Sequence, residues 1–165
     1  MSNITEKQMK ENEYTKYINE HIMNIHNAYV IYKDILCEKL NISPSLLLSN
    51  INKHDQSKYS DEEFNAYRNY FYPCNDEIKD EKMFNNAWEH HYKQNPHHED
   101  YWIDDSGIPK DMPKIYIAEM LLDWAAMAMT FDDNVYEYYT KERDNKAFSY
   151  NTKKIIDSVI DIFKR

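Results

Sequence analysis

The chain contains a single glycine, Gly107, among its 165 residues. Tight hairpin turns depend on glycine, because most other residues adopt positive φ angles only with strain. A P-loop and a dinucleotide-binding fingerprint each need several glycines and are therefore excluded. The same shortage disfavours a fold built from many hairpins. The chain is therefore expected to be helical.

Apolar residues recur at steps of three and four residues along most of the chain, which is the spacing of one face of an α-helix. This spacing predicts helices over residues 13–40, 44–53, 61–72, 80–94, 113–131 and 150–163, after a frayed start over residues 1–11. Pro44 fits the first turn of a helix, and Ser60 and Glu63 fit a capping box. The expected fold is one all-α domain over residues 1–165, a compact bundle of about six or seven helices.

The net charge is −9, from 29 acidic and 20 basic side chains. Double-stranded nucleic acid is held by an excess of Lys and Arg, so this balance argues against a nucleic-acid-binding protein. It does not exclude a small phosphorylated substrate, because a bound metal ion supplies local positive charge.

The first residues are polar and have no apolar core of a signal peptide. No run of about eighteen uncharged apolar residues predicts a membrane span. Cys37 and Cys74 match no CxxC pattern and are expected to be free thiols in a reducing cytoplasm. A homo-oligomer is compatible with the sequence, which does not decide the oligomeric state.

Two carboxylates interrupt the most apolar segment, residues 115–131. Glu119 and Asp123 are four residues apart and therefore share one face of the predicted helix. A buried carboxylate without a partner would cost several kcal/mol. The partner is a basic residue, a hydrogen-bond network or a metal ion, and the sequence leaves these open.

Four of the seven histidines lie within the stretch HHYKQNPHH. His90 and His91 precede the helix breaker Asn95-Pro96, and His97 and His98 follow it. Aromatic residues on both sides indicate that the two pairs adjoin the core, although a surface tract is the alternative. His91 continues the apolar face of its helix and is the better inward ligand of the first pair.

Further candidate ligands occur earlier in the chain. His21 lies on the apolar stripe of the first helix, with His26 less central, and a hydrogen-bonded core histidine is the alternative reading. His54 and Asp55 form an HD pair in KHDQSK, followed by Lys58. Imidazoles with carboxylates suit Mn, Fe, Co, Ni or Zn, whereas calcium prefers oxygen ligands only. We predict a site for one or two divalent transition-metal ions, with candidate ligands His21, His54, Asp55, His91, His97, His98 and Asp123.

The order H…HD…D resembles the HD-domain superfamily of metal-dependent phosphohydrolases, which is all-helical. HDQSK is similar to the HDxGK of the HD-GYP phosphodiesterases, where the lysine approaches the substrate phosphate, and the histidine pairs resemble the histidines that bind a second metal there. HHEDYW lacks the GYP signature, and SK replaces GK.

A closer resemblance covers residues 18–128. The blocks HI..I, HD.SK followed by Glu63, HHY..N.HH and EM..DW.A are similar to an uncharacterised family found in phage and bacterial genomes, whose activity is not known. Glu99-Asp100 stands where Pro-Glu is expected.

The resemblance to HD domains implies a metal-dependent phosphohydrolase or phosphodiesterase acting on a nucleotide or a small phosphodiester, with a cyclic nucleotide signal and phage counter-defence as one version. Asp55 would orient the attacking water and Lys58 would neutralise a phosphate oxygen. Glu119 would orient a ligand imidazole or act as a general base. The alternatives are an HD-fold di-iron oxygenase and a non-enzymatic protein that binds a nucleotide or a partner.

Overall fold

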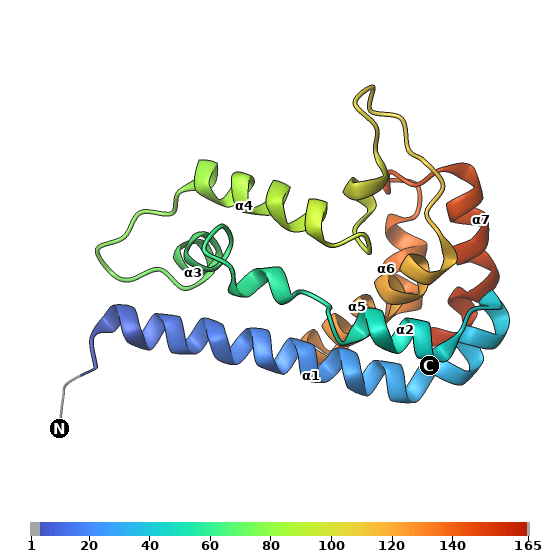
Figure 1. Ribbon diagram of the computed structural model, residues 1–165, viewed down its shortest axis with the longest axis horizontal. Coiled ribbons are helices and arrows are strands. Elements are labelled where there is room, and N and C mark those ends of the chain that lie inside the picture. Colours follow the sequence, from blue (N-terminus) through green and yellow to red (C-terminus); the bar gives the residue numbers. More distant parts are fainter. Residues whose placement is uncertain (1–3, 165) are drawn as a thin grey trace.

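A computed structural model describes residues 4–164 of the chain (Figure 1). Its α-helices are α1 (Glu6–Leu40), α2 (Pro44–Ile51), α3 (Phe64–Phe71), α4 (Glu81–Gln94), α5 (Lys114–Phe131), α6 (Val135–Glu142) and α7 (Tyr150–Val159). Its 3-10 helices are η1 (Gln56–Tyr59), η2 (Glu99–Trp102) and η3 (Ile160–Phe163). The described residues contain no strand beyond an isolated bridge between Ile103 and Pro109. The predicted all-α fold is confirmed.

Helix α1 begins at Glu6, so the prediction of a frayed start is wrong for the residues that follow Thr5. Gln8 donates its backbone N–H to the Thr5 hydroxyl at 3.2 Å, and Thr5 donates its own to the Gln8 side chain at 2.9 Å. This capping box satisfies two N–H groups that a helix start otherwise leaves unpaired. Residues 1–3 of the predicted frayed segment lie outside the described residues.

The predicted capping box of Ser60 and Glu63 is wrong. Residues 61–63 form a turn, and α3 begins only at Phe64, whose backbone N–H donates to the Ser60 carbonyl at 2.9 Å. The Glu63 side chain points into the protein and is fully buried beside two histidines. By contrast, α2 starts as predicted: Pro44 occupies the first turn, and the Ser43 hydroxyl accepts the N–H of Leu46.

Two apolar clusters hold the molecule together. The larger one joins the C-terminal half of α1 to α2, α5, α6 and α7, with α5 buried at its centre as the sequence predicted. The smaller one joins the N-terminal half of α1 to α3 and α4. Figure 1 shows this division, with α3 and α4 beside one end of α1 and α2, α6 and α7 gathered at the other.

His21 lies on α1 between the two clusters. Ile18, one turn before it, belongs to the smaller cluster, and Ile25, one turn after it, belongs to the larger one. Each of these isoleucines is fully buried, and His21 is only 3% exposed. The boundary between the two apolar clusters is therefore where α1 presents a polar side chain to the interior.

Among the described residues, no helix combines the length and the apolar character needed to cross a membrane.

Candidate metal centre

The seven predicted ligands meet at this boundary. His21 comes from α1 and Asp123 from α5, while His54 and Asp55 lie between α2 and η1. His91 is in the last turn of α4, and the chain leaves that helix at Asn95 to bring the second histidine pair back to the same place. Four segments distant in sequence thus supply imidazoles and carboxylates to one buried position.

Asp55 occupies the middle of the site. Its φ angle of 56° lies in the left-handed region, which Asp enters more readily than most residues other than glycine. Its Oδ2 lies 3.4 Å from His21 Nε2 and 2.6 Å from Lys58 Nζ, one turn along η1. Its Oδ1 lies 3.3 Å from His91 Nε2 and 3.6 Å from His97 Nε2. His54 Nε2 also lies 3.6 Å from Oδ1, so both oxygens of this carboxylate face imidazoles.

The first group of candidate ligands surrounds His21 and Asp123. His21 Nε2 lies 3.2 Å from Asp123 Oδ1 and 3.4 Å from Asp55 Oδ2. His54 Nε2 lies 3.6 Å from Asp55 Oδ1 and 3.8 Å from Asp123 Oδ1. Two atoms that each bond one ion at about 2.1 Å lie about 3.0–3.5 Å apart at angles of about 90–110°. The separations are close to those that one shared ion requires.

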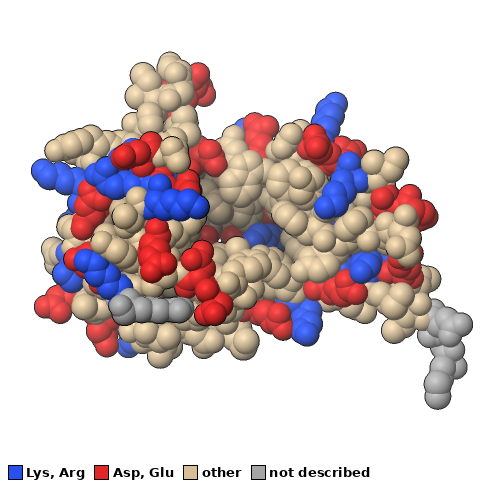
Figure 2. All heavy atoms as spheres, turned by 180° about the vertical axis from the view of Figure 1, so that it is seen from behind, with Lys and Arg blue, Asp and Glu red and all other residues tan. Residues whose placement is uncertain are grey.

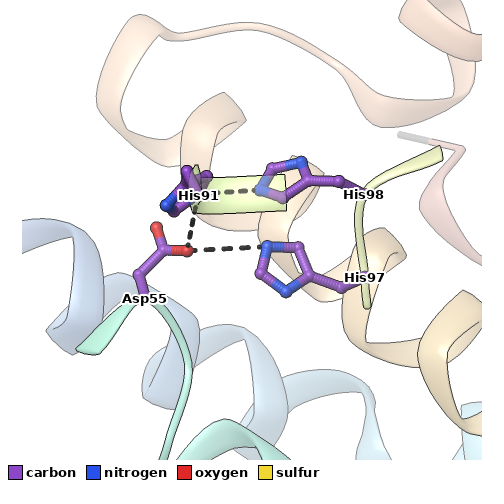
Figure 3. Close-up of side chains that lie close together, drawn as sticks. All are labelled: Asp55, His91, His97 and His98. Atoms are coloured by element: carbon purple, nitrogen blue, oxygen red, sulfur yellow. Dashed lines mark hydrogen bonds and ion pairs between the residues drawn. The ribbon is translucent and has the colours of Figure 1, made fainter. Parts of the chain in front are cut away.

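The second group, drawn in Figure 3, contains Asp55, His91, His97 and His98. Each residue offers one ligand atom, and these atoms all lie within 4.8 Å of one another. The Nε2 atoms of His91 and His98 are 2.9 Å apart. Three imidazoles and a carboxylate are a common ligand set for a divalent transition metal.

Several ligand atoms of these groups have no hydrogen bond. His54 Nε2, Asp55 Oδ1 and His97 Nε2 are buried, and each lacks a hydrogen-bonding partner. A buried polar atom left in this way costs about 1–3 kcal/mol, so three of them around one carboxylate require an explanation. Because all three are good ligands for the same kind of ion, the site fits a bound transition metal.

Two further carboxylates contact the ring nitrogens on the far side of these imidazoles. Glu119 Oε1 lies 3.0 Å from His54 Nδ1 and 3.3 Å from His97 Nδ1. Glu63 Oε2 lies 2.8 Å from His91 Nδ1. A carboxylate that accepts one N–H of an imidazole fixes the ring and leaves the other nitrogen free to bind a metal. Of the two roles predicted for Glu119, this geometry favours orienting the ligands over acting as a general base.

Glu63 and Asn95 are site residues that sequence reasoning missed. Asn95 donates from Nδ2 to the His91 carbonyl at 2.7 Å and to the Ser57 hydroxyl at 2.8 Å, so it joins the end of α4 to η1. By sequence, Glu63 follows the HD.SK block, but its spacing from Ser60 also matches a helix capping box. Asn95 was read only as part of a helix breaker.

The carboxylates of the site are ionised. Burial opposes ionisation of Asp55, but Lys58, His54 and His91 hold its pKa well below the usual value. Burial also opposes ionisation of Glu119, yet its hydrogen bonds to His54 and His97 lower its pKa to about 2. Ionised carboxylates are the form that binds a metal.

Two histidines of the site, His54 and His97, differ in charge. Burial lowers the pKa of His54, but the carboxylates of Asp55, Asp123 and Glu119 outweigh it and raise that pKa to about 10. Burial and the positive charge of His54 together lower the pKa of His97. Without an ion, His54 therefore holds a proton and His97 is neutral, so a metal must displace the proton of His54.

The sequence left open two choices of ligand, and the geometry of the site distinguishes between them. His21 is buried in the site, while His26 is partly exposed and belongs to none of the groups that could hold an ion. His91 faces Asp55, while the contact of His90 is with Glu63, at 2.8 Å, and its side chain is 30% exposed. The structure thus places His21 and His91 with the other candidate ligands.

A cavity of about 560 Å³ adjoins the site and reaches the surface. His21, Asp55, His91 and Asp123 form part of its lining, and Lys58 is its one basic side chain other than histidine. Figure 2 shows a hollow near the middle of the molecule with mostly uncharged walls and blue atoms at its base. A volume of this size suits a small molecule.

Fold and site together define an all-helical protein with a buried histidine–carboxylate cluster that opens into a cavity. The chain belongs to DUF5662, a family of unknown function, whose model matches residues 10–162. No curated protein and no solved structure matches the chain. Membership of a family of unknown function agrees with the closer of the two predicted resemblances, while the likeness to HD domains stays a prediction.

Proposed function

We propose that the protein is a metal-dependent phosphohydrolase that cleaves a small phosphate ester. The observation that carries this proposal is the position of Asp55, whose carboxylate lies among imidazoles of both ligand groups while Lys58 lies beside it at the cavity. His21, His54 and Asp123 would hold one ion, and His91, His97 and His98 the other. Asp55 would be shared by both.

Charge supports two ions over one. Asp55, Glu63, Glu119 and Asp123 are ionised in the site, and Lys58 supplies one positive charge. With every histidine of the site neutral, three negative charges therefore remain, and one divalent ion leaves the site negative. With two, it becomes positive and attracts an anionic substrate.

Bound divalent ions supply Lewis acidity and lower the pKa of a coordinated water towards neutrality. The side chains of the site would contact the phosphate and orient the other groups. Lys58 keeps its charge, because Asp55 raises its pKa against the effect of burial, and its ammonium group can contact a phosphate oxygen at the cavity. Glu119 and Glu63 hold the imidazoles in position, and Asp55 would orient the attacking water.

An HD-fold di-iron oxygenase is the second candidate, and the apolar character of the cavity walls favours it. The same ligand set suits iron, and apolar substrates are common for enzymes that activate oxygen. About two irons per chain, visible absorbance and oxygen consumption would identify this activity. Hydrolysis of phosphate esters by protein loaded with manganese in the absence of oxygen would identify the hydrolase.

The proposal is tested by elemental analysis of protein purified without a His-tag. We expect one or two transition-metal ions per chain, a loss of most of this metal in Asp55→Ala, which removes the carboxylate that both ions would share, and normal content in the control His26→Ala. Turnover of phosphate esters should disappear after EDTA treatment and return with Mn, Co or Ni. Wild-type protein that holds no metal, and whose melting temperature metal does not change, would overturn the proposal.

A further inference from the structure

The walls of the cavity are aromatic. Beyond the metal centre, its lining comes from α1, α3, α4 and the end of α5, together with the residue that follows α3. The aromatic wall residues are Tyr17, Phe71, Tyr72, Phe84, Trp88 and Phe131. Phe71 and Phe131 are 56% and 64% exposed, which is unusual for large apolar side chains that line a cavity. The aromatic surface therefore extends from the metal centre to the mouth of the cavity.

Two tyrosine hydroxyls in this lining are buried and unpaired. Tyr14 on α1 and Tyr67 on α3 are 2% and 4% exposed, and neither hydroxyl has a hydrogen-bonding partner. Burial, together with the negative charges of Asp55 and Glu63, raises the pKa of both phenols, so both keep their protons. Each can donate a hydrogen bond to an oxygen of a ligand that occupies the cavity.

The lining offers little with which to recognise a nucleobase. Outside the histidine–carboxylate cluster and Lys58, its side chains include no amide, no carboxylate and no guanidinium group. The polar atoms that remain are tyrosine hydroxyls and the indole N–H of Trp88. The edge of a base and the hydroxyls of a ribose would lose their hydrogen bonds to water here, which is costly in an apolar site. A flat ring with few polar groups would lose little and would contact the aromatic walls.

We infer that the substrate is a phosphate ester of an aromatic, hydrogen-bond-poor group, whose ring lies among the cavity walls and whose phosphate is held by Lys58, Tyr14 and Tyr67. This inference rests on the proposed function for the phosphate and on the cavity for the organic group. Tyr14 and Tyr67 are positioning residues for the phosphate. The walls determine which ester enters.

The test uses phosphonates, because their P–C bond is not hydrolysed and binding is measured without turnover. The protein is loaded with Mn²⁺, and calorimetry compares 1-naphthylmethylphosphonate with methylphosphonate, octylphosphonate and the non-hydrolysable phosphonate analogue of AMP. We expect the naphthyl compound to bind at least tenfold more tightly than each of the other three. Equal affinity of the methyl compound, equal affinity of the octyl compound, or tighter binding of the AMP analogue would each overturn the inference.

Variants separate the two parts of the ligand. Phe131→Ser, at the exposed mouth, should weaken binding of the naphthyl compound about threefold or more and leave methylphosphonate unchanged. Tyr14→Phe and Tyr67→Phe should each weaken both compounds about threefold to tenfold, whereas Tyr150→Phe, 78% exposed and outside the cavity, should weaken neither. Circular dichroism checks that each variant is folded. If Phe131→Ser keeps the full preference for the naphthyl compound, the placement of the ring is wrong.

Hydrolysis is measured on the same preparation with 1-naphthyl phosphate and AMP. Turnover of AMP with weak binding of the naphthyl phosphonate would leave the proposed function standing and overturn the inference about the organic group. Tight, metal-dependent binding of the naphthyl phosphonate without turnover of any phosphate ester would overturn the proposed function instead.

Discussion

The rings of His54 and His97 stack with their centroids 4.1 Å apart, and both present Nε2 towards the same oxygen of Asp55. Two imidazolium ions so close would repel each other, so the pair carries at most one positive charge in the absence of metal. Stacked imidazoles whose Nε2 atoms face one carboxylate oxygen are better explained by bound cations than by packing. The predictions below follow from that arrangement and from its supports.

Replacing Glu119 with Gln should weaken metal binding without removing a ligand. The carboxylate contacts the Nδ1 atoms of both stacked rings, so an amide would lose the charge that favours the orientation of each. We expect metal affinity to fall about tenfold to a hundredfold, measured by competition with a chelator. Glu38→Gln, on the exposed side of α1, is the matched control and should not change it. Unchanged affinity in Glu119→Gln would contradict the orienting role.

The stability of metal-free protein should decrease as the pH rises from about 6.5 to 10. The carboxylates around His54 raise its pKa to about 10 against the effect of burial, and an unfolded histidine has a pKa of about 6.5. A raised pKa stabilises the folded state fully below the unfolded value, and this stabilisation disappears as the pH passes the folded value. Urea unfolding of EDTA-treated protein between these pH values measures the effect.

The control for this pH effect is His54→Gln, because other groups also titrate near pH 10. The difference in unfolding free energy between wild type and variant should shrink as the pH rises. Metal affinity should show the opposite trend and increase with pH, since the ion displaces the proton of His54. Metal affinity that does not change with pH would argue against His54 as a ligand.

Apolar spacing predicted six of the seven α-helices among the described residues and missed the mostly polar α6, Val135–Glu142. The starts of two further helices could not be predicted. The Ser60 and Glu63 pair matches a capping box by sequence, yet the chain turns between them and Glu63 is buried beside His91. A pattern of four residues carries no information about a histidine 28 positions later. The capping box of Thr5 and Gln8 lies among polar residues, where no apolar spacing indicates that a helix begins.

The meeting of the candidate ligands could be predicted because each belongs to a residue type that binds metals. Several also lie at a recognisable place, in an HD pair or on an apolar helix face. The supports of the site could not be predicted in the same way. Asn95 reaches Ser57 across 38 positions, and Tyr14 has the same helical spacing as the core isoleucines that follow it. Only the fold shows that its hydroxyl lines a cavity.

Lys58→Ala should reduce turnover and leave the metal in place. Lys58 contacts Asp55 from the cavity side and offers no ligand atom. If it holds the substrate phosphate, its loss should lower kcat/KM about a hundredfold while elemental analysis gives the wild-type metal content. Lys53→Ala, an exposed lysine before the same HD pair, should leave both quantities unchanged. Loss of metal together with turnover would instead make Lys58 a structural support of Asp55.

A second buried ion pair, outside the candidate metal centre, should contribute to stability at neutral pH and not in acid. Arg68 on α3 is 3% exposed, and its guanidinium group donates two hydrogen bonds to the Glu77 carboxylate. Glu77 also accepts the backbone N–H of Cys74 at 2.9 Å. These contacts lower the pKa of Glu77 to about 2. Glu77→Gln would leave Arg68 buried without its charge partner.

We therefore expect Glu77→Gln to lower the unfolding free energy at pH 7 by about 1.5–3 kcal/mol. The lowered pKa stabilises the folded state above the unfolded value of about 4.5, and this stabilisation disappears as the pH falls towards 2. The difference in unfolding free energy between wild type and variant should therefore decrease as the pH falls from 4.5 to 2, as measured by urea unfolding. Metal content should be unaffected, because Arg68 and Glu77 bond to each other, Tyr72 and Cys74 and not to a candidate ligand. A constant gap at all pH values would mean that the loss comes from packing and not from the carboxylate charge.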